Sequence, residues 1–247
     1  MNTKTSPAIN TPYSAIKDIE LYDFARDKKV TANSLWKDSA ALILVVRRPG
    51  CAICRNEALK LASHRELITE KMASIHGHLS GIKMIAIVQE QIDTEVQDFN
   101  DGFWKGDVFI DEEKRFYRAL GGGELKWSGT TNFLRSSVWK KYLNGRKIVG
   151  GNFKGQGRIL GGSYIVYPGS RGIAFEHREK FFGNFPAIDE LITKCKAISS
   201  NNLDSNTDAS IKKAITAANF CRYNPSEPGL CGGLNGMCPD YDSEDDE

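Results

Sequence analysis

Two cysteines three residues apart, Cys51 and Cys54, are the side chains of this sequence best suited to carry out a reaction. They stand in the stretch VVRRPGCAICR, where Arg47, Arg48 and Arg55 add positive charge. Thiol–disulfide exchange requires one thiolate that attacks and a second thiol that resolves the mixed disulfide, and nearby positive charge favours the thiolate. We therefore predict a redox pair, with Cys51 as the exposed attacking thiol and Cys54 as its partner one turn deeper. The reverse assignment stays open.

Two other interpretations of the pair are also open at this point. The cysteines could be ordinary core residues, or they could form half of a zinc site. The candidate partners for a zinc site are His64, His76, His78, Cys221, Cys231 and Cys238. None of these forms a second pair of ligands at the spacing typical of zinc fingers, so we favour redox chemistry and expect no metal.

The elements around the pair predict where it lies. Ala41–Val46 is a short apolar run of mostly branched residues, which is typical of a strand buried on both faces. A turn at Pro49 and Gly50 follows, and apolar residues then recur at helical spacing from Cys51 to Ile75. Ile82–Val88 is a second strand, and this order predicts two parallel strands joined by a helix. The pair would then lie at a helix N-terminus, where free N–H groups and the helix dipole stabilise a thiolate.

Hydrophobic patterns along the rest of the chain predict further strands and helices around this unit. The strands are Ile19–Phe24, Lys29–Thr31, Val108–Ile110, Ser163–Tyr167 and Ile173–Glu176; the helices are Asp93–Phe99, Glu112–Leu120, Asn132–Leu143 and Pro186–Ile198, with a helical turn at Ser34–Lys37. Their order predicts an α/β protein with a thioredoxin-like fold. We expect a mixed central sheet flanked by helices, with N-terminal strands, a helical insertion and a disordered C-terminal tail.

Composition and charge are those of one globular domain with extensions. The chain has 247 residues, 40% of them hydrophobic and 26% charged, and a net charge of +2. So small a charge argues against a nucleic-acid partner, and the longest apolar run is too short to span a membrane. We expect a flexible N-terminus at 1–15, a thioredoxin-like domain at 16–200 and a mostly disordered, acidic, cysteine-containing tail at 201–247. The N-terminus has no hydrophobic signal core, so we expect a cytoplasmic protein.

Four stretches together resemble a known family. RRPGCAIC, VQEQIDTEVQDF, GDVFIDEEKRFY and RILGGSYIVYPGSRGIAFEHREKFFG follow one another in this order. They resemble the peroxiredoxin-like 2 family, a thioredoxin-fold group that includes prostamide/prostaglandin F synthase and redox-regulatory antioxidant proteins. The resemblance covers about residues 16–198. It implies a thioredoxin-like fold, a redox-active Cys51/Cys54 pair and antioxidant or reductase activity in the cytoplasm.

The sequence departs from better-known thioredoxin-fold proteins at two places. Peroxiredoxins carry Thr or Ser three residues before the attacking cysteine, but Arg48 stands three residues before Cys51 here. The stretch therefore resembles a dithiol reductase site more than a dedicated peroxide trap. The cis-proline of thioredoxin falls near Gly161 or Gly162, and the missing side chains predict a more open floor beside Cys51. The active-site arginine of peroxiredoxins has no clear counterpart in this region, where Arg158 is the nearest basic residue.

These observations predict an oxidoreductase that reduces a peroxide, an endoperoxide or a disulfide. We expect no bound cofactor and recycling by thioredoxin, with NADPH as electron source, or by a similar dithiol. The residues expected to support the two cysteines are Arg47, Arg48, Pro49, Arg55, Gly161 and Gly162. The alternative is a redox-sensing regulatory protein that binds partners according to the state of the pair, without turnover. His177, Arg178 and Glu179 are expected to form structural ion pairs, and the tail cysteines to stay unpaired.

Overall fold

The protein is described here from a computed structural model. The structure describes residues 10–69, 81–129 and 135–204. The chain divides into two units, Met1–Leu203 and Asp204–Glu247. The second unit lies almost wholly outside the described residues, and so do the predicted disordered tail and its three cysteines.

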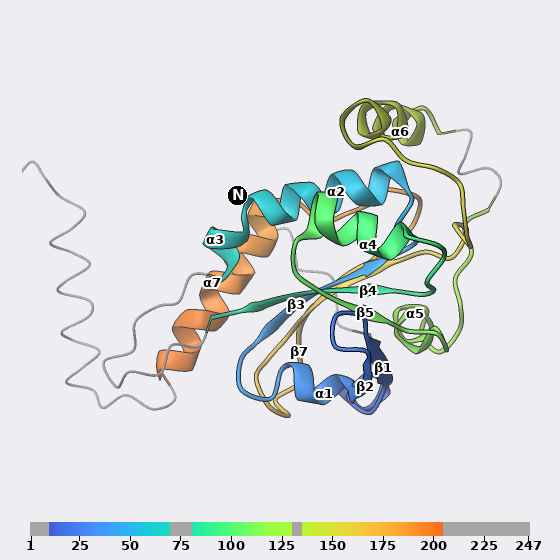
Figure 1. Cartoon of the computed structure of the whole chain (residues 1–247). Coiled ribbons are helices and arrows are strands. Elements are labelled where there is room, and N and C mark those ends of the chain that lie inside the picture. Colours follow the sequence, from blue (N-terminus) through green and yellow to red (C-terminus); the bar gives the residue numbers. More distant parts are fainter. Residues whose placement is uncertain (1–9, 70–80, 130–134, 205–247) are drawn as a thin grey trace, which may run out of the picture. The chain divides into compact units, whose positions relative to one another are not determined.

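A seven-stranded mixed sheet forms the centre of the first unit (Figure 1). Its order is β2-β1-β5-β4-β3-β6-β7. The strands are β1 (Glu20–Asp23), β2 (Lys28–Thr31), β3 (Ala41–Val46), β4 (Lys83–Val88), β5 (Asp107–Ile110), β6 (Gly162–Val166) and β7 (Ile173–Arg178). β3 pairs in parallel with β4 and β4 with β5, whereas the other neighbours are antiparallel. The predicted mixed sheet with N-terminal strands is thus confirmed.

Helices cover both faces of this sheet (Figure 1). They are α1 (Ala32–Leu35), α2 (Ala52–Ser63), α3 (Arg65–Thr69), α4 (Glu95–Phe99), α5 (Arg115–Leu120), α6 (Ser136–Val149) and α7 (Ile188–Asp204), with a 3-10 turn at Tyr13–Ala15 and a π-helix at Asn100–Trp104. α2, α4 and α7 share one apolar cluster with the sheet, and α1 and α5 share the other. No helix of the described residues is long and apolar enough to cross a membrane.

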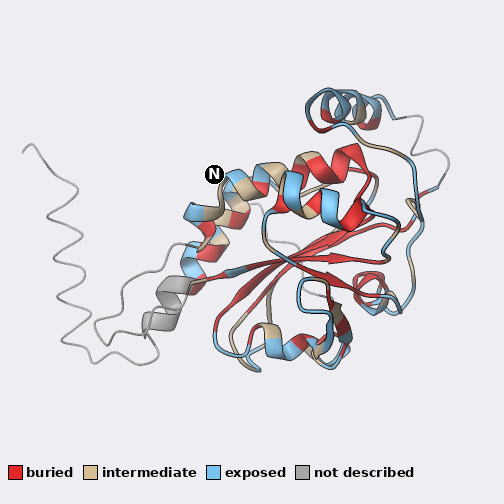
Figure 2. Ribbon diagram, viewed as in Figure 1, coloured by how far each residue is buried: buried red, intermediate tan, exposed pale blue. Residues whose placement is uncertain are grey.

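Side-chain alternation along β3 explains why this strand is apolar throughout. Leu42, Leu44 and Val46 belong to the cluster beneath α2, whereas Ile43 and Val45 belong to the opposite cluster. A strand covered on both faces cannot alternate between apolar and polar residues. Figure 2 accordingly shows the central strands as buried, with exposed residues on the outer surfaces of the helices.

Several helix boundaries differ from the prediction. α1 lies two residues earlier than expected, and α6 and α7 begin later and extend further. The other three differences concern α2, α4 and α5. The helix expected from Cys51 to Ile75 ends at Ser63, and His64 separates it from α3. α4 begins at Glu95, because Asp93 has a left-handed backbone (φ 47°) that no helix can include. α5 begins at Arg115 for the same reason, since Lys114 before it has φ 57°.

The predicted insertion is confirmed as the long helix α6, between α5 and β6, which packs on α2. The two helices approach closely at a glycine: a Cβ atom on Gly145 would lie 2.8 Å from the carbonyl oxygen of Ala52. After α6 the glycine-rich segment 150–161 returns to the sheet along the first turn of α2. This path places residues 153–158 next to the cysteine pair.

Candidate active site

Cys51 and Cys54 lie where β3 passes into α2, as predicted. Cys51 is the N-cap residue of α2, and its amide donates to the Arg48 carbonyl at 3.3 Å. Both thiols are free, and they are buried, with 4% and 3% of their surface exposed. The prediction that Cys51 is an exposed thiol therefore needs correction. Its side chain lines a cavity instead of the outer surface.

The two thiols differ sharply in acidity. The thiol of Cys54 donates a hydrogen bond to the sulfur of Cys51, and this bond, with the positive charge of Arg47, holds the pKa of Cys51 well below its ordinary value of 9.0. The same bond and burial raise the pKa of Cys54 well above that value. Of the two thiols, Cys51 is therefore the one that loses its proton more easily. This favours the predicted order, in which Cys51 attacks first.

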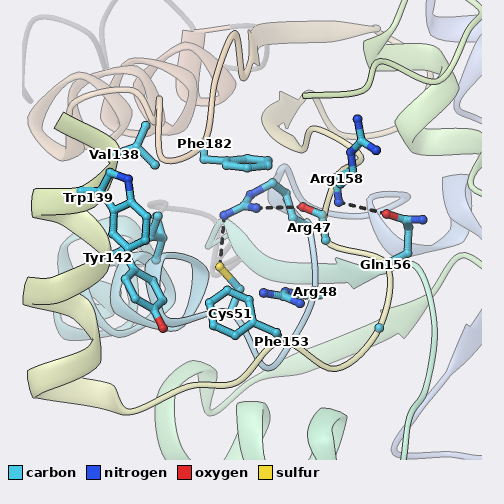
Figure 3. A pocket seen from close by; sticks show the side chains of 13 residues that line it. Arg47, Arg48, Cys51, Val138, Trp139, Tyr142, Phe153, Gln156, Arg158 and Phe182 are labelled. Carbon is cyan, nitrogen blue, oxygen red and sulfur yellow. Dashed lines mark hydrogen bonds between the residues drawn. The ribbon is translucent and has the colours of Figure 1, made fainter. Parts of the chain in front are cut away.

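Arg47 is the positive group closest to the reactive sulfur. Its Nη2 atom donates to Cys51 Sγ at 3.1 Å, and Nη1 donates to the carbonyl of Gly157 at 3.1 Å. The guanidinium also lies over the ring of Phe182, 4.2 Å from its centre (Figure 3). Burial opposes the charge of Arg47, yet the charges of Cys51, Cys54 and Glu179 outweigh burial and raise its pKa. Arg47 thus provides a fixed cation at the site where the thiolate forms.

Glu179 is the carboxylate that pairs with Arg47. Its Oε2 atom lies 3.5 Å from Arg47 Nε, and its side chain is fully buried. The amides of Gly161 and Gly183 donate to the two carboxylate oxygens at 2.9 and 3.1 Å. Burial raises the pKa of this carboxyl, while Arg47 and the two amides oppose that effect. The predicted structural ion pair of this segment is therefore an Arg47–Glu179 pair directly behind the cysteine.

A second buried ion pair holds the turn before Cys51. Arg55 Nε donates to the Pro49 carbonyl at 2.8 Å, and Arg55 Nη2 pairs with Glu95 Oε2 at 3.0 Å. The side-chain amide of Asn152 donates to the other oxygen of Glu95 at 2.7 Å. The backbone N–H of Asn152 donates to the Gly50 carbonyl at 2.8 Å. Arg55 therefore does not touch the sulfur atoms. It fixes the Pro49–Gly50 turn to α4 and to the returning segment.

A cavity of about 330 Å³ opens beside Cys51 (Figure 3). Its lining is Arg47, Arg48, Cys51, Ile53, Val138, Trp139, Tyr142, Phe153, Gly155, Gln156, Gly157, Arg158 and Phe182. The wall includes four aromatic side chains, which come from α6 and from the loops around 153 and 182. Cys54 does not line this cavity, so a molecule inside it meets the sulfur of Cys51.

Gly161 and Gly162 do not form the open floor that was predicted beside Cys51. Gly161 and Gly162 are not among the residues that line the cavity. A Cβ atom on Gly161 would overlap the carbonyl oxygen of Val45, and one on Gly162 would overlap the carbonyl oxygen of His177. Their missing side chains therefore allow the chain to approach β3 and β7, whereas Gly155 and Gly157 are the glycines beside the cavity.

Several residues of the site were not singled out from the sequence. Gln89 donates from its side chain to the carbonyls of Arg47 and Gln156, which joins the end of β3 to the returning segment. Phe153 and Phe182 also line the cavity. They stand in loops, where the sequence has no hydrophobic periodicity that could single them out. Of the tryptophans, Trp139 lines the cavity and Trp104 is buried in the core. The remaining described cysteine, Cys195, is buried in the core, and burial raises its pKa to about 12.

The metal alternative can be examined for part of the chain. Within residues 10–69, 81–129 and 135–204, no group of three or more His, Cys, Asp or Glu side chains could hold a metal ion. His76, His78 and the three tail cysteines lie outside these ranges.

The fold and the buried cysteine pair define a thioredoxin-fold protein of the peroxiredoxin type. A family model described as AhpC/TSA antioxidant enzyme matches residues 66–181, which begin after the cysteine pair. The crystal structure of a mutant of peroxiredoxin 6 from Arenicola marina is similar in fold, with a TM-score of 0.52 and 10% identity over 81% of this chain and 76% of that chain.

Curated relatives identify the family more closely. Peroxiredoxin-like 2A from Danio rerio is 34% identical over 79% of this chain and 85% of the relative. The human peroxiredoxin-like 2A is 35% identical over 77% of this chain and 78% of the relative. The chain therefore belongs to the peroxiredoxin-like 2 family, as the four sequence stretches indicated.

Proposed function

We propose that this protein is a thiol-dependent oxidoreductase that reduces a small organic peroxide through Cys51 and Cys54. The observation that carries the proposal is the contact between Arg47 Nη2 and Cys51 Sγ, 3.1 Å apart at an apolar cavity. A thiolate held by a buried cation is the nucleophile that this chemistry needs. The Cys51 side chain lines this cavity, where a small organic molecule can meet its sulfur.

The first step is attack on the peroxide bond. The Cys51 thiolate takes the terminal oxygen of ROOH, the O–O bond breaks, and the leaving alkoxide takes a proton from water to become ROH. Cys51 is then a sulfenic acid. Arg47 is placed to stabilise the negative charge that moves from sulfur to oxygen.

The second step forms the disulfide. The sulfenic acid no longer carries the negative charge that holds the proton on Cys54, so this thiol becomes easier to deprotonate. Cys54 attacks Cys51, water leaves, and a Cys51–Cys54 disulfide results. A dithiol such as thioredoxin then reduces the disulfide by exchange and leaves as its own disulfide. No bound cofactor takes part in this cycle, which we place in the cytoplasm.

Coupled turnover tests the proposal. NADPH, thioredoxin reductase and thioredoxin are incubated with the protein and with a peroxide, an endoperoxide or a disulfide in parallel. We expect many equivalents of NADPH to be oxidised with a peroxide, and Cys51→Ser to abolish this. Cys54→Ser should still consume about one equivalent of peroxide and stop at the sulfenic acid, which dimedone traps. A single equivalent of NADPH oxidised by the unmodified protein, with no turnover on any acceptor, would leave only the redox-sensing alternative.

A further inference from the structure

We propose that Arg48 is a carboxylate-binding residue, and that the substrates of this site are organic hydroperoxides that carry a carboxylate. This inference rests on the proposed function and names its substrate class. It depends on an imbalance of charge in the cavity and on the unused hydrogen-bonding capacity of one buried arginine.

The cavity holds more positive than negative charge. Its lining includes Arg47, Arg48 and Arg158 but no aspartate or glutamate. Two negative groups lie near these three cations: Cys51, as a thiolate, and Glu179, which both contact Arg47, so one positive charge has no negative counterpart. Arg48 has no ion pair with a carboxylate in the described part of the chain. A ligand with one negative charge would supply this missing partner.

Arg48 is buried but poorly bonded. It is 8% exposed, and its Nε atom has no hydrogen-bond partner within the described residues. Among the described residues, its one side-chain hydrogen bond is long, 3.4 Å from Nη1 to the Lys154 carbonyl. A guanidinium has five N–H donors in a planar fork that matches a carboxylate. Leaving such donors buried without partners is costly, so this arginine is poised for an anion.

The surroundings of Arg48 direct the guanidinium into the cavity. Its central carbon lies 5.0 Å from the centre of the Phe153 ring, which forms part of the wall. A Cβ atom on Gly157 would lie 2.8 Å from Arg48 Nε, so the guanidinium packs closely against this glycine. Figure 3 shows Arg48 beside Cys51 and Phe153 at the cavity, where one ligand can meet the guanidinium and the sulfur together.

The rest of the cavity wall favours a ligand whose remaining part is apolar. Ile53, Val138, Trp139, Tyr142 and Phe182 offer hydrocarbon and ring surfaces. The volume of about 330 Å³ lies in the range of pockets that bind a small organic ligand. A single aromatic ring with an alkyl hydroperoxide on one side and a carboxylate on the other fits this description. Hydrogen peroxide would use neither the wall nor Arg48.

Binding of unreactive analogues tests Arg48 without any catalysis. The probes are para-isopropylbenzoate and para-isopropylbenzamide, which share a shape and differ in charge, and calorimetry measures their dissociation constants. We expect the benzoate to bind about tenfold or more tightly than the benzamide, because a hydrogen bond to a charged group is lost with the amide. Arg48→Gln should remove this preference. Arg146→Gln, an equal charge change on an exposed residue of α6, should keep it.

Turnover provides a second and separate test. Cumene hydroperoxide and its para-carboxylate derivative are compared in the thioredoxin-coupled assay, and the result is the ratio of their kcat/KM values. We expect the ratio to favour the carboxylate in the unmodified protein and in Arg146→Gln, and to fall about tenfold or more in Arg48→Gln. The ratio removes any effect of Arg48 on the sulfur itself.

Equal binding of benzoate and benzamide would overturn the role of Arg48, even if cumene hydroperoxide is turned over well. An unchanged kcat/KM ratio in Arg48→Gln would overturn it too. If no peroxide is turned over but the benzoate preference exists and depends on Arg48, the anion site stands and the proposed peroxide reduction fails.

Discussion

Arg47 offers the sharpest test of how this site activates its thiol. Arg47→Met removes the cation that donates to Cys51 Sγ at 3.1 Å, and it also leaves the fully buried Glu179 without its partner. Breaking a buried pair from one side costs about 3–5 kcal/mol of unfolding free energy. Losing a hydrogen bond to a charged group, worth about 1.5–3 kcal/mol, should slow the reaction of Cys51 about 10- to 150-fold at neutral pH.

A second variant separates these two effects. Arg47→Met combined with Glu179→Gln removes both charges, so no unpaired charge remains in the core. We expect part of the lost stability to return, because the oxygen of Gln can still accept from one of the two amides that bind Glu179, whereas its NH2 group faces the other N–H donor. The reactivity of Cys51 should stay low, because the cation is still absent. In the single variant the loss of stability should shrink as the pH falls, because Glu179 then takes up a proton.

Two measurements follow the two effects. Urea unfolding under reducing conditions gives the free energies. The rate of Cys51 alkylation by iodoacetamide, located by mass spectrometry across a range of pH, gives the reactivity. Arg178→Met is the matched control, because Arg178 also lies 3.5 Å from a carboxylate, that of Glu176, but does not line the cavity. A double variant whose Cys51 reacts as fast as in the unmodified protein would refute the role of Arg47.

Three further predictions concern stability. Because folding lowers the pKa of Cys51, its thiolate contributes to the free energy of unfolding. This contribution should be fully present above pH 9.0 and should be lost as the pH falls through the lowered pKa. In urea melts, the difference in stability between the unmodified protein and Cys51→Ala should therefore grow with rising pH. Gly161→Ala should cost about 1–3 kcal/mol by crowding β3, whereas Gly102→Ala, with open space around it, should change the melt little. Arg55→Met should cost about 3–5 kcal/mol in the same assay by leaving Glu95 unpaired, and Glu95→Gln in the same chain should restore part of that loss.

The fold could be predicted largely because its central strands carry an unambiguous signal. Ala41–Val46 has the bounds that its apolar run indicates, since a strand covered on both faces is apolar throughout. The beginnings of α4 and α5 could not be predicted, because they depend on left-handed backbone at Asp93 and Lys114. In α5 the buried Asp111 caps the amides of Arg115 and Phe116, a contact that tertiary packing creates.

The site was predictable only where it is local in sequence. Cys51, Cys54 and Arg47 stand within one turn and one helix end, so their proximity follows from the chain itself. Glu179 and Phe182 come from the far end of β7, and Phe153 comes from the segment after α6. No spacing rule links them to Cys51, because their meeting depends on how β6 and β7 pair beside β3.

The double variant tests whether the buried Arg47–Glu179 pair serves stability or the reactivity of Cys51. Replacing a buried ion pair by uncharged groups of similar size is often neutral or stabilising, because desolvation offsets much of the attraction between the charges. Stability is therefore a weak reason for this chain to bury both groups behind Cys51. The geometry supplies a stronger one: the Glu179 carboxylate lies 3.5 Å from Nε as an ion-pair partner and the Gly157 carbonyl binds Nη1, while Nη2 donates to the sulfur. If this reasoning holds, removing both charges should leave a stable protein whose Cys51 reacts as an ordinary buried thiol.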